Sequence, residues 1–391
     1  MYSLLLAIIY VAFVSLGLPD SLLGSGWPSM QAQMGVPLFY AGVISMIITA
    51  GTIVSSLLTG KVLKKWGTGL VTAGSVLVTA VALFGFSASA AFWMLCLWAI
   101  PYGLGAGAID AALNHYVALH YASRHMSWLH CFWGLGATIS PYIMSYCLLR
   151  GFGWDSGYRS IAILQIALTA VLFFSLPLWK KRENGLPKEE AHAAAPKLSK
   201  IFRIRGVKHI LLAFFSYCAL ETTVGLWASS YLALGRGIAS ETAAQYASLF
   251  YMGITGGRFL SGFVADRLGD RRMIQIGIAV MLLGIVAVGL PIQAEWVCLY
   301  GLVVIGLGCA PVYPSIIHAT PSTFGAEHAQ AIVGVQMASA YTGAAFIPPL
   351  FGLIANHINV NFFPAFLMVF AIIIVISTQK LNKMISFDGV K

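Results

Sequence analysis

Long runs of apolar residues, separated by short polar stretches, follow one another along the whole chain. Each run is about 20 residues long, the length that an α-helix needs to cross the hydrocarbon core of a bilayer. The runs are too long and too continuous for the strands of a β-barrel, whose apolar residues alternate over about ten positions. We therefore predict twelve membrane-spanning helices near residues 3–28, 37–60, 68–88, 91–119, 126–149, 159–179, 208–233, 243–264, 273–290, 294–317, 329–354 and 360–379.

One polar stretch is much longer than the others and divides the chain. Residues 181–207 read KRENGLPKEEAHAAAPKLSKIFRIRGV and separate six predicted spans from six more. We expect an all-α membrane protein with a six-helix bundle over residues 1–180, a cytoplasmic linker over residues 181–207 and a second six-helix bundle over residues 208–391.

The two halves resemble each other in the order of their small and polar residues, at an offset of about 200 residues. One such match is weak in a chain with 40 glycines, but four in the same order are hard to obtain by chance. Parallel repeats of this kind predict two bundles related by an axis along the membrane normal, with the substrate bound between them. The matching pairs are Asp20-x3-Gly24 with Glu221-x3-Gly225, Gly60-x3-Lys64-Lys65-x-Gly67 with Gly262-x3-Asp266-Arg267-x-Gly269, Gly103-Leu104-Gly105 with Gly306-Leu307-Gly308, and Gly136-Ala137-x3-Pro141 with Gly343-Ala344-x3-Pro348.

Composition and charge agree with a membrane protein. The chain is 59% hydrophobic and 9% charged, whereas about a quarter of the residues of a soluble protein are charged. The net charge of +10 comes from Lys and Arg that gather in every second loop. Because basic loops stay on the cytoplasmic side, we expect both termini in the cytoplasm and the protein in an inner or plasma membrane. The excess of basic residues reflects the membrane topology, and it does not predict a nucleic-acid partner.

Three carboxylates, Asp20, Asp110 and Glu221, lie inside predicted spans. A charge at the bilayer centre costs about 3 kcal/mol or more, so such groups face a bundle interior or a water-filled path. They pair, bind a solute or carry protons. A polytopic transporter is therefore the leading interpretation before any motif is considered.

The segment Gly262–Arg272, GFVADRLGDRR, resembles the loop signature of the major facilitator superfamily, G-x-x-x-D-R-x-G-R-R. It departs at Asp270, where the signature has a basic residue. The resemblance implies the fold of that superfamily, and it implies that the loop acts as a conformational latch between transport states. The first-half copy has Lys64 at the acidic position, and a loop that only sets topology is the alternative. The implied latch residues are Gly262, Asp266, Arg267, Gly269, Arg271 and Arg272.

A narrower resemblance is to the fucose permease group of sugar–proton symporters. It rests on residues 17–24 (GLPDSLLG), on Asp110 and Asn114 after Gly103-Leu104-Gly105, and on residues 128–137 (WLHCFWGLGA). The resemblance implies acids in spans 1 and 4 that take part in proton coupling and sugar binding. The group has amide side chains in span 5, where this chain has His130 and Trp133, so the identity of the substrate stays open.

Spacing assigns the acids provisional roles. Asp110 and Asn114 are four residues apart and share one helix face, so together they can accept from and donate to sugar hydroxyls. Asp20 follows Gly17 and Pro19, which break a helix, and broken helices mark transporter sites. A carboxyl taken out of water can be held neutral and so carry a proton. We expect proton coupling by Asp20, Asp110 and Glu221, and substrate binding by Asp110, Asn114 and Glu221. A purely structural hydrogen bond is the alternative for Asp20 and for Asp110, and Glu221 could carry the proton in place of Asp20.

Several further side chains are candidates for the substrate site, although each could instead serve packing or an interfacial aromatic belt. Arg258, close to the predicted end of span 8, is expected to snorkel or to pair with loop acids. The histidines at positions 115, 120, 125 and 130 do not share a helix face, so no metal is predicted. The candidates are Trp27, His130, Trp133, Trp227, Tyr313, Gln336 and Tyr341.

The residue patterns predict a secondary transporter, most simply a monomer that works by alternating access. The resemblance to the fucose permease group implies that it imports a neutral monosaccharide with a proton. There is no phosphate-binding loop in the sequence and no catalytic constellation, so we expect neither an enzyme nor a cofactor. A proton-driven exporter of a drug or metabolite is the alternative transporter. A non-transporting membrane sensor is the alternative from another class.

Overall fold

The computed structural model describes residues 2–121, 123–183, 201–291 and 295–388. Every regular element within these residues is helical. The first half contains α1 (Tyr2–Asp20), α2 (Leu22–Met34), α3 (Tyr40–Ser87), α4 (Phe92–His120), α5 (Ser123–Leu149) and α6 (Trp154–Glu183). The second half contains α8 (Val207–Ser230), η1 (Tyr231–Gly235), α9 (Ser240–Leu268), α10 (Asp270–Gly289), α11 (Glu295–His318), α12 (Thr320–Phe324), α13 (Ala326–Ile354), η2 (Ala355–Asn359), η3 (Val360–Phe362) and α14 (Phe363–Asp388).

The predicted spans are confirmed as helices of membrane length. Eight helical runs in the described residues are long and apolar enough to cross a membrane. Two of these runs hold two spans each: α3, which is divided at Gly67, and Ala331–Met384, which covers α13 and α14. Helices α5 and α9 are equally long, but polar residues such as His130 and Arg258 lower their mean hydropathy. Together they give the twelve spans of the prediction.

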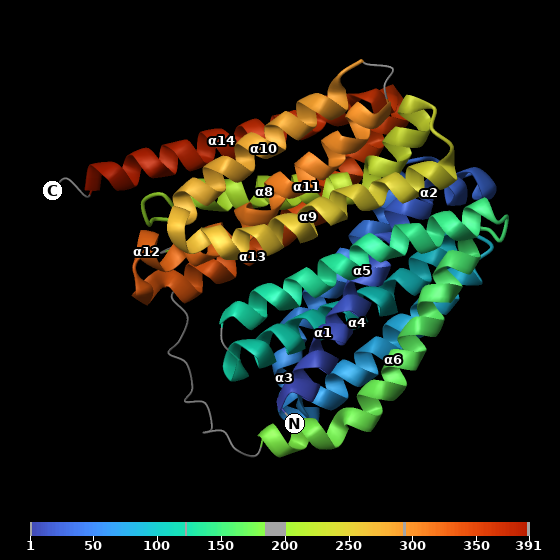
Figure 1. Cartoon of the computed structure of the whole chain (residues 1–391), viewed down its shortest axis with the longest axis horizontal. Helices are drawn as coiled ribbons and strands as arrows, with labels where there is room; N and C mark the ends of the chain where they lie inside the picture. Colours follow the sequence, from blue (N-terminus) through green and yellow to red (C-terminus); the bar gives the residue numbers. More distant parts are fainter. Residues whose placement is uncertain (1, 122, 184–200, 292–294, 389–391) are drawn as a thin grey trace.

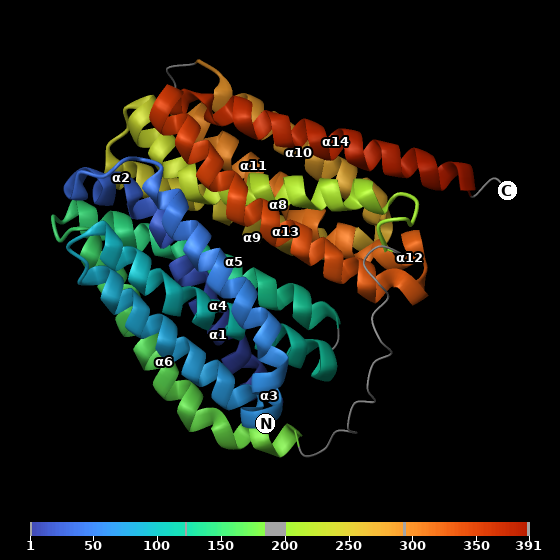
Figure 2. The same ribbon diagram turned by 180° about the vertical axis from the view of Figure 1, so that it is seen from behind.

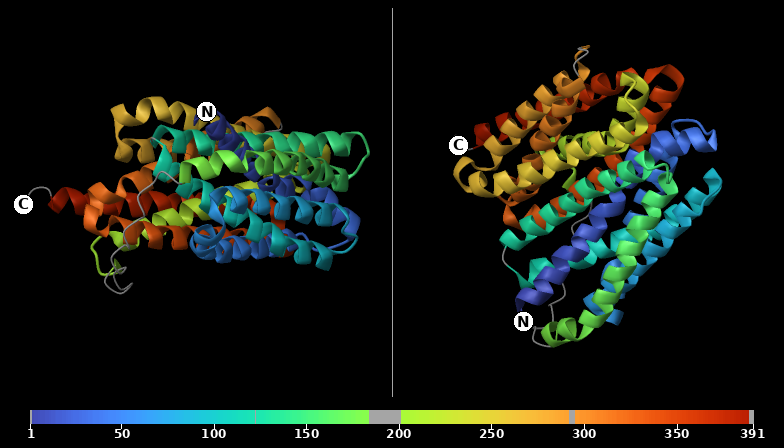
Figure 3. Two further views of the ribbon diagram at one scale, coloured as in Figure 1. Left: turned by 90° about the horizontal axis from the view of Figure 1, so that it is seen from below. Right: turned by 45° about the vertical axis from the view of Figure 1, so that its right-hand side comes forward.

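The helices form two bundles. In the first, α1 packs against α5 and α6, and α3 packs against α4 and α6. In the second, α8 packs against α13 and α14, while α9 and α10 pack against α11. Figures 1 and 2 and the right-hand view of Figure 3 show the two sets side by side. The expected linker falls mainly on residues 184–200, which lie outside the described residues.

The internal repeat is visible in the backbone. Gly67 and Gly269, matched in the two loop copies, share φ/ψ values of 74°/161° and 73°/158°, a conformation that favours glycine. A side chain on Gly136 would meet the carbonyl of Val14 in span 1, and one on its counterpart Gly343 would meet the carbonyl of Phe215 in span 7. Equivalent glycines therefore make equivalent helix contacts in the two bundles.

The first span is broken at its acid. Helix α1 contains Pro19 and ends at Asp20, and α2 begins at Leu22. The break agrees with the expectation drawn from Gly17 and Pro19. It places the Asp20 carboxyl at the junction of two helices, where irregular backbone at membrane depth is tolerated only against protein or water.

The two bundles meet along α5 and α9, and they are also joined at the ends of the helices that lie away from the termini. Gly24 of α2 lies against Gly225 of α8, and Gly42 of α3 lies against Pro349 of α13. Hydrogen bonds also join the bundles here: Ser229 donates to the Ser25 carbonyl (3.3 Å), and the Leu38 N–H donates to the Asn356 side chain (3.0 Å). In Figure 1 the bundles come together near α2 and diverge toward the ends that carry both termini.

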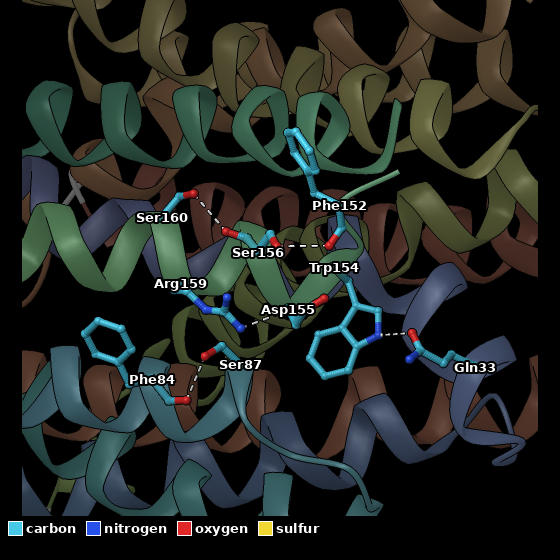
Figure 4. Close-up of polar contacts among 9 residues, drawn as sticks. All are labelled: Gln33, Phe84, Ser87, Phe152, Trp154, Asp155, Ser156, Arg159 and Ser160. Atoms are coloured by element: carbon cyan, nitrogen blue, oxygen red, sulfur yellow. Dashed lines mark hydrogen bonds and ion pairs between the residues drawn. The ribbon is translucent and has the colours of Figure 1, made fainter. Parts of the chain in front are cut away.

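The same closed end ties α6 to α2. Figure 4 shows the Trp154 indole N–H donating to the side-chain oxygen of Gln33 at 2.7 Å, beside the exposed Arg159–Asp155 pair at 3.3 Å. The span was expected to begin near residue 159, but α6 begins at Trp154. Asp155 and Arg159 make the first two turns polar, which hides the start of the helix from an apolar pattern although Asp155 suits a helix N-terminus.

Candidate functional site

Asp20 is held by the first bundle from two sides. One carboxylate oxygen accepts from the Tyr102 hydroxyl on α4 at 2.7 Å, and the other accepts from the Trp133 indole N–H on α5 at 2.8 Å. The Asp20 side chain is nevertheless exposed, although it lies in the middle of a membrane-length run. Solvent therefore reaches a carboxylate whose orientation is set by α4 and α5.

Asp110 and Asn114 meet on one face of α4, as their spacing predicts. The Asn114 side-chain amide donates to the Asp110 carboxylate at 2.8 Å and to the Asp110 main-chain carbonyl at 3.0 Å. Both side chains are half-buried. One Asp110 carboxylate oxygen and the Asn114 amide oxygen accept no hydrogen bond within the described residues, so the pair can still accept from a bound hydroxyl.

Glu221 on α8 faces Arg258 on α9, and this corrects the expectation for Arg258. The guanidinium lies 3.8 Å from the Glu221 carboxylate. The Glu221 side chain is 16% exposed and the Arg258 side chain is 14% exposed. Arg258 therefore neither snorkels nor pairs with loop acids. The expectation was wrong because α9 extends to Leu268, which places position 258 well inside the helix.

Trp133 joins the acids of the two bundles. Its indole N–H is bonded to Asp20, and the Arg258 guanidinium of the other bundle lies 5.4 Å from the centre of its ring. Such a cation–π contact is favourable, and more so away from water. Tyr251 of α9 meets the same ring edge to face, at 6.2 Å between centroids. A continuous path of contacts thus runs from Asp20 through Trp133 and Arg258 to Glu221.

Three other predicted residues lie near this path. Tyr341 on α13 is within electrostatic range of Asp110, and His130 on α5 is within range of Arg258. The His130 ring also meets Phe13 edge to face at 5.6 Å. Tyr313 is further into the second bundle, where its ring packs on Phe214 at 4.9 Å.

Three predicted residues are placed elsewhere. Trp27 and Trp227 are fully buried, and their indole N–H groups donate to the carbonyls of Leu38 and Pro348, each at 2.8 Å. Neither ring offers a face to a solute, so in this structure both are packing residues. Gln336 is also fully buried, and its side-chain oxygen accepts from Thr320 at 3.1 Å. A hydropathy pattern cannot distinguish a buried indole from one that lines a path.

The loop signature lies at the end where the bundles diverge. The Asp266 side chain lies outside the described part of the chain. The expected latch role of Asp266 therefore stays a prediction. Asp270, the departure from the signature, lies 2.8 Å from the His318 ring at the end of α11. An acid is thus accommodated there by a partner on the neighbouring helix. Gly269, Asp270, Arg271 and Arg272 line a pocket of about 460 Å³ together with α12.

The sequence analysis missed Arg258, Tyr102 and Tyr251 as site residues. A signal was available for Arg258, because a cation inside a predicted span is subject to the same cost as the three acids. No such signal exists for the two tyrosines, since nothing local distinguishes them from the other 14 tyrosines of the chain, which has 16. In the described residues there is no group of three or more His, Cys, Asp or Glu side chains that could hold a metal ion.

Comparisons with known proteins find similarity over most of the chain. The sequence model of the Major Facilitator Superfamily matches residues 9–348. Bypass of stop codon protein 6 of Saccharomyces cerevisiae is 22% identical over 386 residues, which is 90% of this chain and 77% of the yeast protein. The cis,cis-muconate transport protein of Acinetobacter baylyi is 22% identical over 370 residues, which is 89% of this chain and 86% of the relative.

The fold is also found among solved structures. The crystal structure of a point mutant of the nucleoside transporter NupG superimposes with a TM-score of 0.77 at 13% identity. The match covers 96% of this chain and 98% of the other. The names of these relatives do not support the narrower resemblance to the fucose permease group.

Proposed function

The chain belongs to the Major Facilitator Superfamily of membrane transporters, and we propose that it is a proton-coupled symporter of a small, hydroxylated solute of the monosaccharide class. The observation that carries the proposal is the Asp110–Asn114 pair. It is half-buried on α4, where Asp110 lies within electrostatic range of Tyr341 in the second bundle, and it has acceptor capacity left over. The Trp133 ring nearby is of the kind on which a sugar ring stacks.

Proton coupling is proposed for the carboxylates of the two repeats. Asp20 is accessible to solvent and held by two donors, and Glu221 occupies the equivalent position in the second bundle. Transport of a proton requires a group that is charged on one side of the membrane and neutral on the other. A carboxylate at a helix break between two bundles meets that requirement.

Alternating access is proposed to proceed by rocking of the two bundles. The contacts around Gly24, Leu38 and Asn356 close one end of the interface. With the termini in the cytoplasm, as the basic loops favour, this arrangement is the inward-facing state in an inner or plasma membrane. The latch role of Asp266 and Arg267 is part of the same proposal and rests on the signature.

The comparisons bear on the solute. The A. baylyi relative is named for muconate, a carboxylate. The proposal therefore includes hydroxylated solutes with and without a carboxylate group, of which the neutral monosaccharide is one. An exporter would be expected to bind its solute in a wide and largely apolar site, which the Asp20–Glu221 path does not resemble. The relatives whose names state a role are transport proteins, which does not favour a non-transporting sensor.

The proposal is tested with the purified protein in liposomes. Labelled monosaccharides and sugar acids should accumulate when the outside is more acidic than the inside, and a protonophore should abolish the accumulation. A folded protein that binds a solute in a thermal-shift assay but transports none would contradict it. A solute that drives proton movement in the opposite direction would identify an exporter.

A further inference from the structure

Arg258 is a cation that makes no hydrogen bond within the part of the chain that the structure describes. Its nearest carboxylate, Glu221, is 3.8 Å away, beyond hydrogen-bond distance, and its other contact is the face of Trp133. Within the described residues none of its N–H groups donates a hydrogen bond. An arginine has five such donors, and leaving them without acceptors away from water is costly. The side chain is only 14% exposed, so bulk water offsets this cost only in part.

The position of Arg258 matters as much as its lack of bonds. It lies on α9 at the interface between the bundles, over a ring from α5, rather than among the contacts that close the outer end. The charged or titratable groups near it, with Asp20 beyond Trp133, are Glu221, His130, Cys131, Tyr217 and Cys309. A guanidinium in this place can donate hydrogen bonds to a solute that enters the interface.

We infer that the solute carries a carboxylate, which Arg258 binds, and that the transported class is sugar acids rather than neutral sugars. The inference rests on the proposed function and specifies the substrate of the same site. A planar guanidinium matches a carboxylate through two parallel hydrogen bonds, which supplies the missing acceptors. The ring hydroxyls of a sugar acid then meet Asp110 and Asn114, and its ring lies near Trp133.

Binding of an anion here explains how the proton is coupled. A bound carboxylate competes with Glu221 for the one guanidinium, so Glu221 loses its partner beside a second negative charge. The repulsion is relieved when Glu221 takes up one proton from the side on which the solute enters. The proton is released on the other side when the solute leaves and Glu221 faces Arg258 again. One anion then moves with one proton, and no net charge crosses the membrane.

The test uses D-glucuronate and D-glucose, which share their ring hydroxyls and differ only in whether C6 is a carboxylate or a hydroxymethyl group. We expect proton-driven uptake of glucuronate, competition by unlabelled glucuronate, and at least about tenfold weaker competition by glucose. Uptake should not respond to a membrane potential set by potassium and valinomycin. Uptake of glucose with a proton would respond to it, since that cycle carries charge.

Variants separate a binding role from a structural one. Arg258→Gln should weaken glucuronate binding by about 30-fold or more, because it truncates one partner of a buried charge pair. Arg258→Lys should retain a part of the binding, since the positive charge stays but the paired N–H donors of the planar guanidinium are lost. Arg159→Gln removes an exposed arginine near the start of α6 (Figure 4) and should leave binding and uptake unchanged. Glu221→Gln should still bind glucuronate but lose accumulation.

The outcomes distinguish this inference from the proposed function. If glucose accumulates and glucuronate neither accumulates nor competes, the inference that the solute carries a carboxylate is wrong. The proposed function, proton-coupled symport of a sugar, then still holds. If Arg258→Gln takes up glucuronate as well as the unaltered protein does, Arg258 is structural and the inference fails. If the folded protein binds and accumulates neither compound, both the inference and the sugar-class proposal fail.

Discussion

Gly24 on α2 and Gly225 on α8 touch across the interface between the two bundles. A methyl group on Gly24 would overlap the carbonyl oxygen of Gly225, so the two backbones are as close as glycine permits. The two residues are equivalent in the internal repeat. Each follows its acid, Asp20 or Glu221, by four residues, about one helical turn. The closed end of the interface therefore begins one turn beyond the two carboxylates proposed to carry protons.

The Gly24–Gly225 contact should set the balance between transport states. Gly24→Ala forces the backbones apart at the closed end, and overpacking of this kind costs about 1–3 kcal/mol, enough to change a two-state ratio by about five- to 150-fold. We expect the population closed at this end to fall. Spin-label distances between the outer ends of α2 and α8 would measure the shift.

Gly74→Ala is the matched control, since a side chain there would meet nothing within 4 Å. It should leave the distances unchanged. An unaltered distance distribution in Gly24→Ala would show that the contact does not hold the bundles together.

Asp20→Asn should separate accumulation from exchange. The amide can still accept from the Trp133 N–H while its NH2 group faces the Tyr102 hydroxyl, so the local packing survives. The variant cannot gain or lose a proton. If Asp20 carries the coupled proton in place of Glu221, proton-driven accumulation is lost, while exchange of labelled for unlabelled solute, which needs no net proton movement, is retained. If Asp20→Asn accumulates solute normally while Glu221→Gln only exchanges it, Glu221 is the proton carrier.

Asp110→Asn should lose both activities. It replaces an acceptor for a solute hydroxyl by a group that is partly a donor, and an unsatisfied buried partner costs about 1–3 kcal/mol. Equilibrium binding, measured by thermal shift or calorimetry, should weaken by a corresponding factor of about five to 150. Normal binding with normal accumulation in this variant would leave Asp110 as a structural residue bonded to Asn114.

Trp133 is expected to have two separable roles. Trp133→Phe keeps a ring beneath Arg258 but removes the N–H that Asp20 accepts, so it should slow uptake more than it raises the KM. Trp133→Ala removes the ring as well and should raise the KM. Initial rates of uptake over a range of solute concentrations would distinguish the two. Equal effects of both variants on the KM would mean that the ring contributes nothing to solute binding.

The orientation is tested by labelling from one side. In a variant without reactive native cysteines, Cys introduced at Lys64 or Lys188 should react with an impermeant maleimide only after the cells are opened. Cys at Arg150, at the opposite end of the helices, should react in intact cells. The reverse labelling pattern would mean that the termini lie outside the cell and that the closed end of the interface faces the cytoplasm.

The amino-acid sequence alone determined the spans, the two halves and their repeat. These follow from local quantities: the length of an apolar run sets whether a helix crosses the membrane, and the order of Gly and charged residues repeats at a fixed offset. The cost of charge in lipid also made Asp20, Asp110 and Glu221 candidates without any knowledge of packing. The Asp110–Asn114 pair could be predicted because both residues are on one helix face.

Only the tertiary structure decided which side chains of different helices contact one another. Trp27 and Trp133 are similar in sequence context, yet one is buried in packing and the other lies between Asp20 and Arg258. The partners of Trp133 are more than 100 residues away on either side, on α1 and α9. Periodicity places a side chain on a face of its own helix, but which helix meets that face depends on packing across the chain. Arg258 therefore became a site residue only when α9 was seen against α5 and α8.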